Sequence, residues 1–107
     1  MPDDNKIALV KYRLEQSREC LDSAIRDVTA LAYKAAANRS YYSIFHAMRA
    51  VLAFDRFDSK THSGIISTFR QRYIKTGVFP TDHSDIIQSA FNISWKERLL
   101  GFLCDFE

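Results

Sequence analysis

The chain has 107 residues, a net charge of +2 and a hydrophobic fraction of 47%. This length suits a single domain, residues 1–107, and the hydrophobic fraction is too high for a disordered chain. The weak net charge does not by itself indicate a nucleic-acid-binding surface, which needs clustered basic residues. Only three glycines and two prolines are present. Sheets and long loops need more such residues, so the composition predicts helices.

The chain carries two cysteines, Cys20 and Cys104, which lack metal-ligand spacing. We interpret them as free thiols in a reducing compartment. No apolar run approaches the roughly 20 residues that cross a bilayer, so we predict a cytoplasmic protein without a membrane segment. Since no His, Cys, Asp and Glu cluster has ligand spacing, we predict no bound metal and no cofactor.

Apolar residues at helical spacing predict four main helices, joined by short polar connections. They cover about residues 4–29, 32–54, 61–75 and 82 onward. Asp4 or Asn5 can cap the first helix, and Ser59 or Thr61 the third. Gly77 suits the C-terminal cap of that third helix. Short connections favour an antiparallel bundle, which places the chain in the all-α class.

The second predicted helix contains the segment "NRSYYSIFHAMRAVL", Asn38 to Leu52. At about 100° per residue, one side is a continuous apolar stripe. The members of this stripe are Ala37, Tyr41, Ile44, Phe45, Met48, Val51 and Leu52. The opposite side carries Arg39, Tyr42, Ser43, His46, Ala50 and Ala53. Arg39 and His46 therefore share a side, two turns and roughly 10 Å apart along the axis.

Two interpretations of the Arg39 and His46 side stay open. In the first, it is an ordinary solvent face, which is the commoner situation for charged residues on a helix. In the second, its small residues Ser43, Ala47, Ala50 and Ala53 let a second copy of the chain approach closely. A solvated face usually carries more lysine and glutamate than this one, which favours a homodimer with paired basic sites.

The segment Asn38 to Leu52 resembles the second-helix signature of the HEPN domain family (higher eukaryotes and prokaryotes nucleotide-binding domain). The resemblance is to its small stand-alone bacterial and archaeal branch. Three further segments are similar to the same branch, and the likeness extends over about residues 7–93. These segments are "KTHSGIISTF" (Lys60 to Phe69), "YIKTG" (Tyr73 to Gly77) and "AFNI" (Ala90 to Ile93).

The resemblance implies a dimeric helical bundle that acts as a metal-independent endoribonuclease. Many members carry an arginine followed after four to six residues by a histidine, and Arg39 and His46 fit with six residues between them. It further implies a toxin whose antitoxin is a nucleotidyltransferase partner. One subfamily has a tyrosine two residues after the histidine, where nucleotide is added. Met48 stands there in this chain, so that form of control is not expected.

RNA cleavage uses the 2′-hydroxyl as nucleophile, and it needs a base, an acid and positive charge on the phosphate. We therefore assign His46 as the general acid/base and Arg39 as the phosphate-binding group. Asn38, Tyr42 and Ser43 are expected to line the substrate cleft. Lys60 and His62, at the start of the third helix, are further substrate-binding candidates, although we favour a capping and packing role for them.

Three more basic residues, Arg70, Arg72 and Lys75, lie on the third predicted helix. They could steer RNA towards the protein, but we interpret them as a solvated face.

The family-like pattern stops after Ile93, and the tail 94–107, "SWKERLLGFLCDFE", is divergent. For some choices of allowed codons from Ser94 onward, a one-base frameshift gives a family-like continuation, and on this hypothesis we predict an atypical or truncated C-terminal end. Two alternatives to an enzyme follow. One is a non-catalytic module that binds nucleotide or a partner protein, and the other is an inactive remnant held by its partner.

Overall fold

A computed structural model describes residues 4–92 of the chain. Every regular element in this range is a helix, which confirms the all-α prediction. The elements are α1 (Asp4–Thr29), α2 (Tyr33–Phe54), α3 (His62–Phe69), the π-helix η1 (Arg70–Ile74) and a helix at residues 82–92, here called the fourth helix. The divergent tail, residues 94–107, lies outside the described residues.

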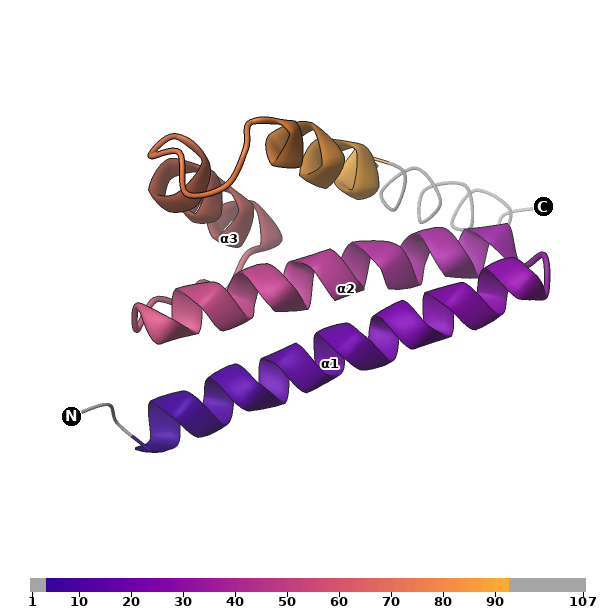
Figure 1. Cartoon of the computed structure of the whole chain (residues 1–107), viewed down its shortest axis with the longest axis horizontal. Helices are drawn as coiled ribbons and strands as arrows, with labels where there is room; N and C mark the ends of the chain where they lie inside the picture. The colour runs from indigo at the N-terminus through magenta and orange to yellow at the C-terminus, as the bar shows by residue number, and fades with distance from the viewer. Residues whose placement is uncertain (1–3, 93–107) are drawn as a thin grey trace.

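The first two helices form an antiparallel hairpin (Figure 1). Its turn contains neither glycine nor proline, and Leu31 takes the left-handed conformation, with φ at 62°. Glycine usually occupies this position at a helix end. The Ala32 N–H donates to the Asp27 carbonyl at 2.7 Å and closes the turn. The helix therefore ends by backbone hydrogen bonding, which explains why the sequence gives only a weak signal there.

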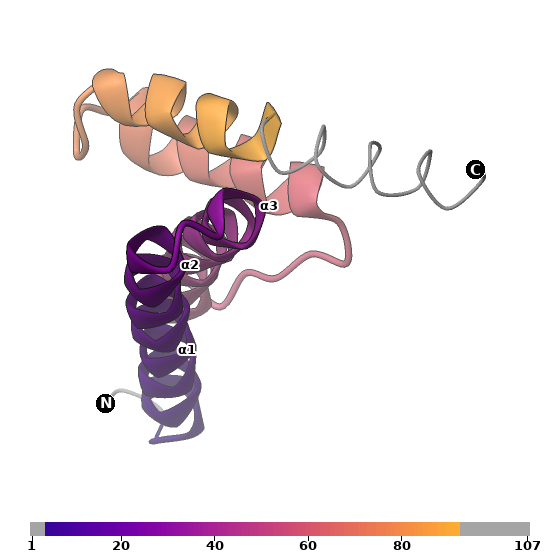
Figure 2. The ribbon, with the colours of Figure 1, turned by 90° about the vertical axis from the view of Figure 1, so that its right-hand side faces the viewer.

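Helix α2 lies between α1 on one side and α3 with the fourth helix on the other (Figures 1 and 2). Two different stripes of α2 are consequently buried. The stripe towards α3 contains Tyr41, Phe45, Met48 and Leu52, and it packs with Ile65, Ile66, Phe69, Ile74 and Ile87 in one apolar core. Tyr41 is 1% exposed and Leu52 is 0% exposed. The predicted core stripe of the second helix is thus confirmed.

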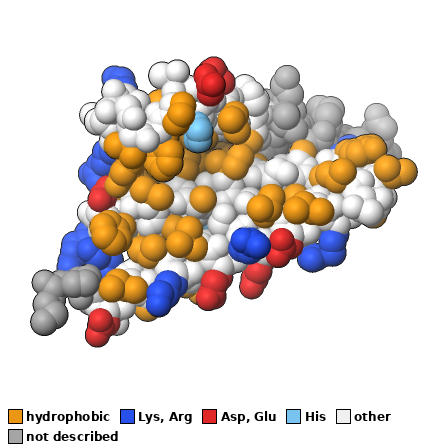
Figure 3. All heavy atoms as spheres, in the orientation of Figure 1, with side chains coloured by type: hydrophobic (Ala, Val, Ile, Leu, Met, Phe, Trp, Pro, Cys, Tyr) orange, Lys and Arg blue, Asp and Glu red, His pale blue; other side chains and the backbone are white. Residues whose placement is uncertain are grey.

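The face of α1 that meets α2 is more polar than its apolar spacing suggests. Its two buried residues are Arg13 and Ala24. Large apolar residues of α1 remain exposed beside this contact, and apolar side chains spread along the face of the hairpin in Figure 3. They are Leu9, Tyr12, Leu14, Leu21, Ile25 and Val28. At about 100° per residue, Leu14, Leu21, Ile25 and Val28 share one side of α1, and Leu9 and Tyr12 lie on another side.

The third predicted helix exists, but it changes type at its middle. Thr61 caps α3 by accepting a hydrogen bond from the Gly64 N–H at 3.0 Å. From Arg70 onward the backbone forms a π-turn, in which the Lys75 N–H donates to the Arg70 carbonyl at 2.9 Å. Gly77 then ends the segment with φ at 83°, as its predicted capping position requires.

The prediction that the basic residues of the third helical segment form a solvated face is wrong for Arg70. Its side chain is half-buried and donates from Nη2 to Gln88 Oε1 at 2.8 Å and to the Ser84 carbonyl at 3.3 Å. Arg70 therefore ties η1 to the fourth helix. Arg72 is exposed, as predicted, and its guanidinium pairs with Asp55 at 3.8 Å.

Tyr73 links η1 to the C-terminal end of α2 by donating its hydroxyl proton to Asp55 Oδ2. Burial, together with this hydrogen bond and the Asp55 charge, raises the pKa of Tyr73 to about 12. The unfolded chain loses the same proton at about pH 10. Between these values the native state binds more protons than the unfolded state, so stability falls as pH rises.

We expect Tyr73→Phe to abolish this alkaline sensitivity. The wild type should lose unfolding free energy relative to the variant as pH rises from about 10 towards about 12, because only the wild type must give up the proton on unfolding. Urea unfolding of both proteins at several pH values in this window measures the difference. If the difference in unfolding free energy between the two proteins stayed constant across this pH window, the Tyr73 hydroxyl would not be the cause of the alkaline sensitivity.

Cys20 is a free thiol on α1, in agreement with the sequence prediction, whereas Cys104 lies outside the described residues. Among the helices in the described range, none is long and apolar enough to span a membrane.

Candidate functional site

Arg39 and His46 both belong to α2, which is unbroken from Tyr33 to Phe54. They therefore share one side of the helix, about 10 Å apart along its axis. Arg39 is exposed and His46 is half-buried. Tyr42 lies one turn before His46, and the two ring centroids are 6.1 Å apart. An arginine, an aromatic ring and an imidazole thus follow one another along this side.

The small residues near this side contact α1 of the same chain. Ser43 is buried, and its Oγ donates to the Ser17 carbonyl at 2.9 Å, while Ser17 Oγ donates to the Ser43 carbonyl at 2.7 Å. Ala50 and Ala53 are 0% and 4% exposed. Ala47, the fourth of the small residues, is half-buried, but for Ser43, Ala50 and Ala53 the expectation of a second subunit is wrong. They admit α1, because two reciprocal serine bonds require a close approach of the backbones.

The environment of His46 favours its neutral form. Burial is the largest cause of a pKa below the usual value of about 6.5, and the positive charges of Arg49 and Arg13 lower the pKa further. His46 Nδ1 is buried and has no hydrogen-bond partner among residues 4–92. A doubly protonated ring would leave a buried N–H unpaired, which also opposes the cation. At neutral pH the ring is therefore uncharged and able to accept a proton.

A network of three charged side chains lies next to His46. Arg49 donates from Nε to Asp58 Oδ1 at 3.2 Å and from Nη2 to Asp58 Oδ2 at 2.9 Å, which makes a bidentate pair. Arg13 crosses from α1 and donates to Asp58 Oδ2 and to the Arg49 carbonyl, both at 3.3 Å. Arg13 is only 7% exposed, so this network connects α1, α2 and the following loop.

Two opposing effects act on the Asp58 carboxyl. Burial raises its pKa, but the hydrogen bonds from Arg49 and the Ser59 N–H, together with the charges of Arg49 and Arg13, leave the pKa below its usual value. Asp58 is therefore ionised at neutral pH, and one carboxylate partly neutralises two guanidinium groups. Arg13, Arg49 and Asp58 together carry a net positive charge, which is one reason why the His46 imidazole resists protonation.

A cavity of about 570 Å³ opens beside this network. Its walls are formed by Phe45, Arg49, Asp58, Ser59, Lys60, Thr61 and His62. Two sequence candidates, Lys60 and His62, thus lie in one cavity with Arg49. The loop that carries Lys60 is tightly packed, because a Cβ on Gly64 would clash with Ser59 Oγ.

His62 is packed firmly against the aromatic core. Its ring stacks on Phe45 with the centroids 4.1 Å apart, and its Nδ1 lies 2.7 Å from the Tyr41 hydroxyl. Tyr42 meets the same ring edge-on at 5.9 Å. His62 therefore bridges the side of α2 that carries His46 and the start of α3.

The structure separates the sequence candidates into two groups. Arg39, Tyr42 and His46 follow the side of α2, with Asn38 half-buried at its beginning. Lys60 and His62 lie across the adjacent cavity, while Ser43 is turned towards α1. Sequence reasoning missed Arg13, Arg49 and Asp58. Arg49 follows His46 by three positions, and this helical spacing is the signal that could have identified it.

Within residues 4–92, no group of three or more His, Cys, Asp and Glu side chains is placed to hold a metal ion. The charged groups near His46 are instead the guanidinium donors of Arg13 and Arg49 and the Asp58 carboxylate between them, and the His46 imidazole is neutral. Such donors match phosphate oxygens, and such an imidazole can accept a proton from a hydroxyl.

The fold and the site define a small all-helical domain with an arginine and a histidine on one side of its second helix. The model of the HEPN domain family matches residues 10–102. The chain belongs to the HEPN domain family, as the segment Asn38 to Leu52 indicated.

Several relatives have similar sequences. A UPF0332 protein of Thermotoga maritima is 31% identical over 74 residues, which are 69% of this chain and 56% of that protein. A Methanocaldococcus jannaschii protein called "Putative toxin MJ0605" is 33% identical over 64 residues, 60% of this chain and 48% of the relative. A UPF0332 protein of Gloeobacter violaceus is 35% identical over 89 residues, 82% of this chain and 61% of the relative.

The chain spans from 48% to 61% of the length of these three relatives. No solved structure matches it significantly.

Proposed function

We propose that this HEPN domain is a metal-independent endoribonuclease and the toxin of a toxin–antitoxin-type pair. The observation that carries the proposal is the half-buried, neutral His46, which lies on the same side of α2 as the exposed Arg39. Next to it are Arg13 and Arg49, which both pair with Asp58. The resemblance of the Arg39 and His46 spacing to the family pattern supports the same function. Relatives of this chain carry the word toxin in their names, which supports the biological role.

In the proposed reaction, His46 accepts the proton of a 2′-hydroxyl, and that oxygen attacks the adjacent phosphorus. The bond from phosphorus to the 5′ oxygen breaks, and this oxygen takes a proton from an imidazolium. Arg39 binds the phosphate and stabilises its added negative charge. The lowered pKa of His46 suits the base, and the imidazolium that forms when His46 takes the 2′-hydroxyl proton is the acid that protonates the 5′ oxygen.

The spacing of Arg39 and His46 supports a site built from two copies. They are about 10 Å apart along α2, which is too far for both to contact one phosphate easily. If two α2 helices cross in antiparallel fashion near Tyr42, Arg39 of each copy lies next to His46 of the other. A two-fold axis there produces two equivalent Arg and His pairs in one cleft.

We further propose a nucleotidyltransferase as the partner that restrains the toxin. The support is the family resemblance, so this part depends on the toxin assignment. The specific alternative for the whole chain is a non-catalytic module in which the same residues bind nucleotide or a partner protein.

The test is RNA cleavage by the purified chain in the presence of EDTA. We expect the wild type to cleave and Arg39→Gln to lose about 10²-fold in rate, because a phosphate-binding donor is removed. Arg26→Gln is the matched control, since Arg26 is an exposed arginine on α1 that is not among the residues assigned to the site. Activity that disappears with EDTA would contradict the metal-independent mechanism, and RNA binding without cleavage would select the non-catalytic alternative.

A further inference from the structure

Arg49 follows His46 by one turn of α2, and it lines the cavity of about 570 Å³ that also contains Lys60 and His62. Residues three apart on a helix are neighbours, with a rise of about 4.5 Å between them. Arg39 of the same copy is about 10 Å from His46 along the axis, so Arg49 is the nearer of the two. We infer that Arg49 is a further catalytic residue, which binds the scissile phosphate beside His46 and stabilises its added negative charge. This inference rests on the proposed ribonuclease.

The charge of Arg49 already acts on the His46 imidazole. After burial, it is the largest of the causes that lower the pKa of His46, ahead of the Arg13 charge. Coulombic repulsion weakens with distance, so this order agrees with the helical spacing. Once His46 has taken the 2′-hydroxyl proton, the same repulsion favours transfer of that proton to the 5′ oxygen. One guanidinium therefore assists both halves of the proposed reaction.

The hydrogen bonds of Arg49 leave one of its donor atoms unused. Nε donates to Asp58 Oδ1 at 3.2 Å, and Nη2 donates to both carboxylate oxygens, at 3.0 Å and 2.9 Å. Within residues 4–92, Nη1 makes no hydrogen bond, and the side chain is 28% exposed. A guanidinium has five N–H groups in a fixed fork, so the two on Nη1 are left for a phosphate oxygen.

Asp58 and Arg13 hold this guanidinium in place before a substrate binds. Arg13 is 7% exposed, and it donates to Asp58 Oδ2 and to the Arg49 carbonyl, both at 3.3 Å. The Phe45 ring supports the same guanidinium, whose central carbon lies 5.9 Å from the ring centroid. A donor that is fixed in advance needs no reorganisation as negative charge develops, which is the condition for strong stabilisation. Asp58 and Arg13 are therefore positioning residues, and Arg49 is the group that contacts the phosphate.

The ion pair with Asp58 does not cancel the charge of Arg49. Among the described residues that line the cavity, Asp58 alone is acidic, and it is shared with the guanidinium of Arg13. Lys60, exposed on the same cavity, adds a further positive charge. The cavity therefore has a net positive charge, which attracts a phosphate. In the proposed two-copy site, Arg49 of one copy and Arg39 of the other then bind one phosphate.

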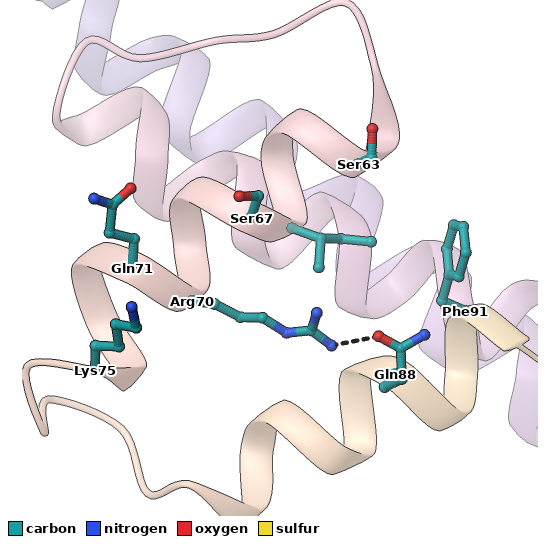
Figure 4. A pocket seen from close by; sticks show the side chains of 8 residues that line it. Ser63, Ser67, Arg70, Gln71, Lys75, Gln88 and Phe91 are labelled. Atoms are coloured by element: carbon teal, nitrogen blue, oxygen red, sulfur yellow. Dashed lines mark hydrogen bonds between the residues drawn. The ribbon is translucent and has the colours of Figure 1, made fainter.

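Arg70 is also a half-buried arginine, but it serves the fold. It lines a separate cavity, of about 610 Å³, between α3 with η1 and the fourth helix (Figure 4). Its guanidinium extends to the fourth helix and donates to Gln88 Oε1. The charge of Arg70 is not among the causes that lower the pKa of His46. Of these two arginines, only Arg49 lies beside the imidazole.

The test compares rates of oligoribonucleotide cleavage in EDTA at about pH 8, where His46 is neutral. We expect Arg49→Gln to lose about 10²-fold in kcat, with a smaller change in KM, because the contact strengthens as charge develops. Asp58→Asn breaks the same ion pair but keeps the guanidinium, so its loss should be about tenfold smaller. Arg18→Gln is the matched control, since it breaks only the exposed Arg18 and Asp22 pair on α1 and should cleave as the wild type does.

Arg49→Lys keeps a cation beside Asp58, and it carries the test if circular dichroism shows that Arg49→Gln does not fold. Lysine lacks the planar fork, so we expect its kcat to fall by about tenfold. Wild-type kcat in Arg49→Lys or in a folded Arg49→Gln would overturn the inference. An equal loss in Asp58→Asn and Arg49→Gln would also overturn it, because the role of Arg49 would then be structural. These outcomes leave the proposed ribonuclease intact, whereas a wild type that does not cleave contradicts both.

Discussion

The His46→Ala variant is expected to lose RNA cleavage by about 10²–10⁴-fold, the range of a general acid/base. The loss follows from the proposed role, because the variant has no group to take the proton of the 2′-hydroxyl. Its fold should persist, since His46 is only half-buried and its Nδ1 has no partner among the described residues to lose. Initial rates of oligoribonucleotide cleavage, with circular dichroism as the check of folding, measure the effect.

The pH profile of the wild type gives a sharper test of His46. Because the pKa of this imidazole is lowered, the rate should decline on the acid side only below about pH 6.5. Fold stability should decline in the same direction, since the unfolded chain binds a proton that the native site excludes. His83→Ala is the matched control, because His83 is exposed on the fourth helix. Full activity in His46→Ala would refute the assignment.

The Asp58→Asn variant is expected to lose about 1–3 kcal/mol of unfolding free energy. It removes the carboxylate that pairs with Arg13 and Arg49 and leaves two neighbouring cations without compensation. The side chain of Arg13 is 9% exposed, so water cannot fully replace the lost partner. The added positive charge should also lower the pKa of His46 further and move the acid limb of the rate profile to lower pH.

The loss in Asp58→Asn should itself depend on pH. The folded pKa of Asp58 is lowered, so its contribution is present above the usual value of about 3.9 and disappears as pH falls through the folded value. The two proteins should therefore converge in acid. Asp22→Asn is the control: its ion pair with Arg18 is exposed, and a change within about 0.5 kcal/mol is expected. If Asp58→Asn and Asp22→Asn lost equal unfolding free energy, the network near His46 would stabilise the fold no more than an exposed ion pair does.

The helix positions could be predicted because local signals agreed with the final packing. The second helix was expected at about residues 32–54 and is observed at Tyr33–Phe54. Thr61 begins the third helical segment with a side-chain cap, and Gly77 ends it with a left-handed φ. Both features depend on residue type alone. The π-turn was not predicted, because its wider ring has no signature in hydrophobic spacing.

The candidate site could be predicted only within α2. Helical period places Arg39 and His46 on one side without any tertiary information. Arg13, by contrast, reaches the Arg49 carbonyl from 36 positions away, and nothing near it in the sequence indicates a buried role. The small residues were misinterpreted for the same reason, since their size indicates a close neighbour but does not say which one. In this structure the neighbour is Ser17 of α1.

The π-turn at Arg70–Ile74 has a consequence for how related genes should be compared. A π-turn holds one residue more than the α-helical turn it replaces. A relative with a one-residue deletion between Phe69 and Lys75 would keep a continuous α-helix, with its counterpart of Lys75 four positions after its counterpart of Arg70. In an α-helix the N–H of the later residue of such a pair bonds to the carbonyl of the earlier one, so the two stay on one side of the helix. A one-residue gap in this short segment therefore marks the loss of the π-turn and not a change in how Lys75 lies relative to Arg70.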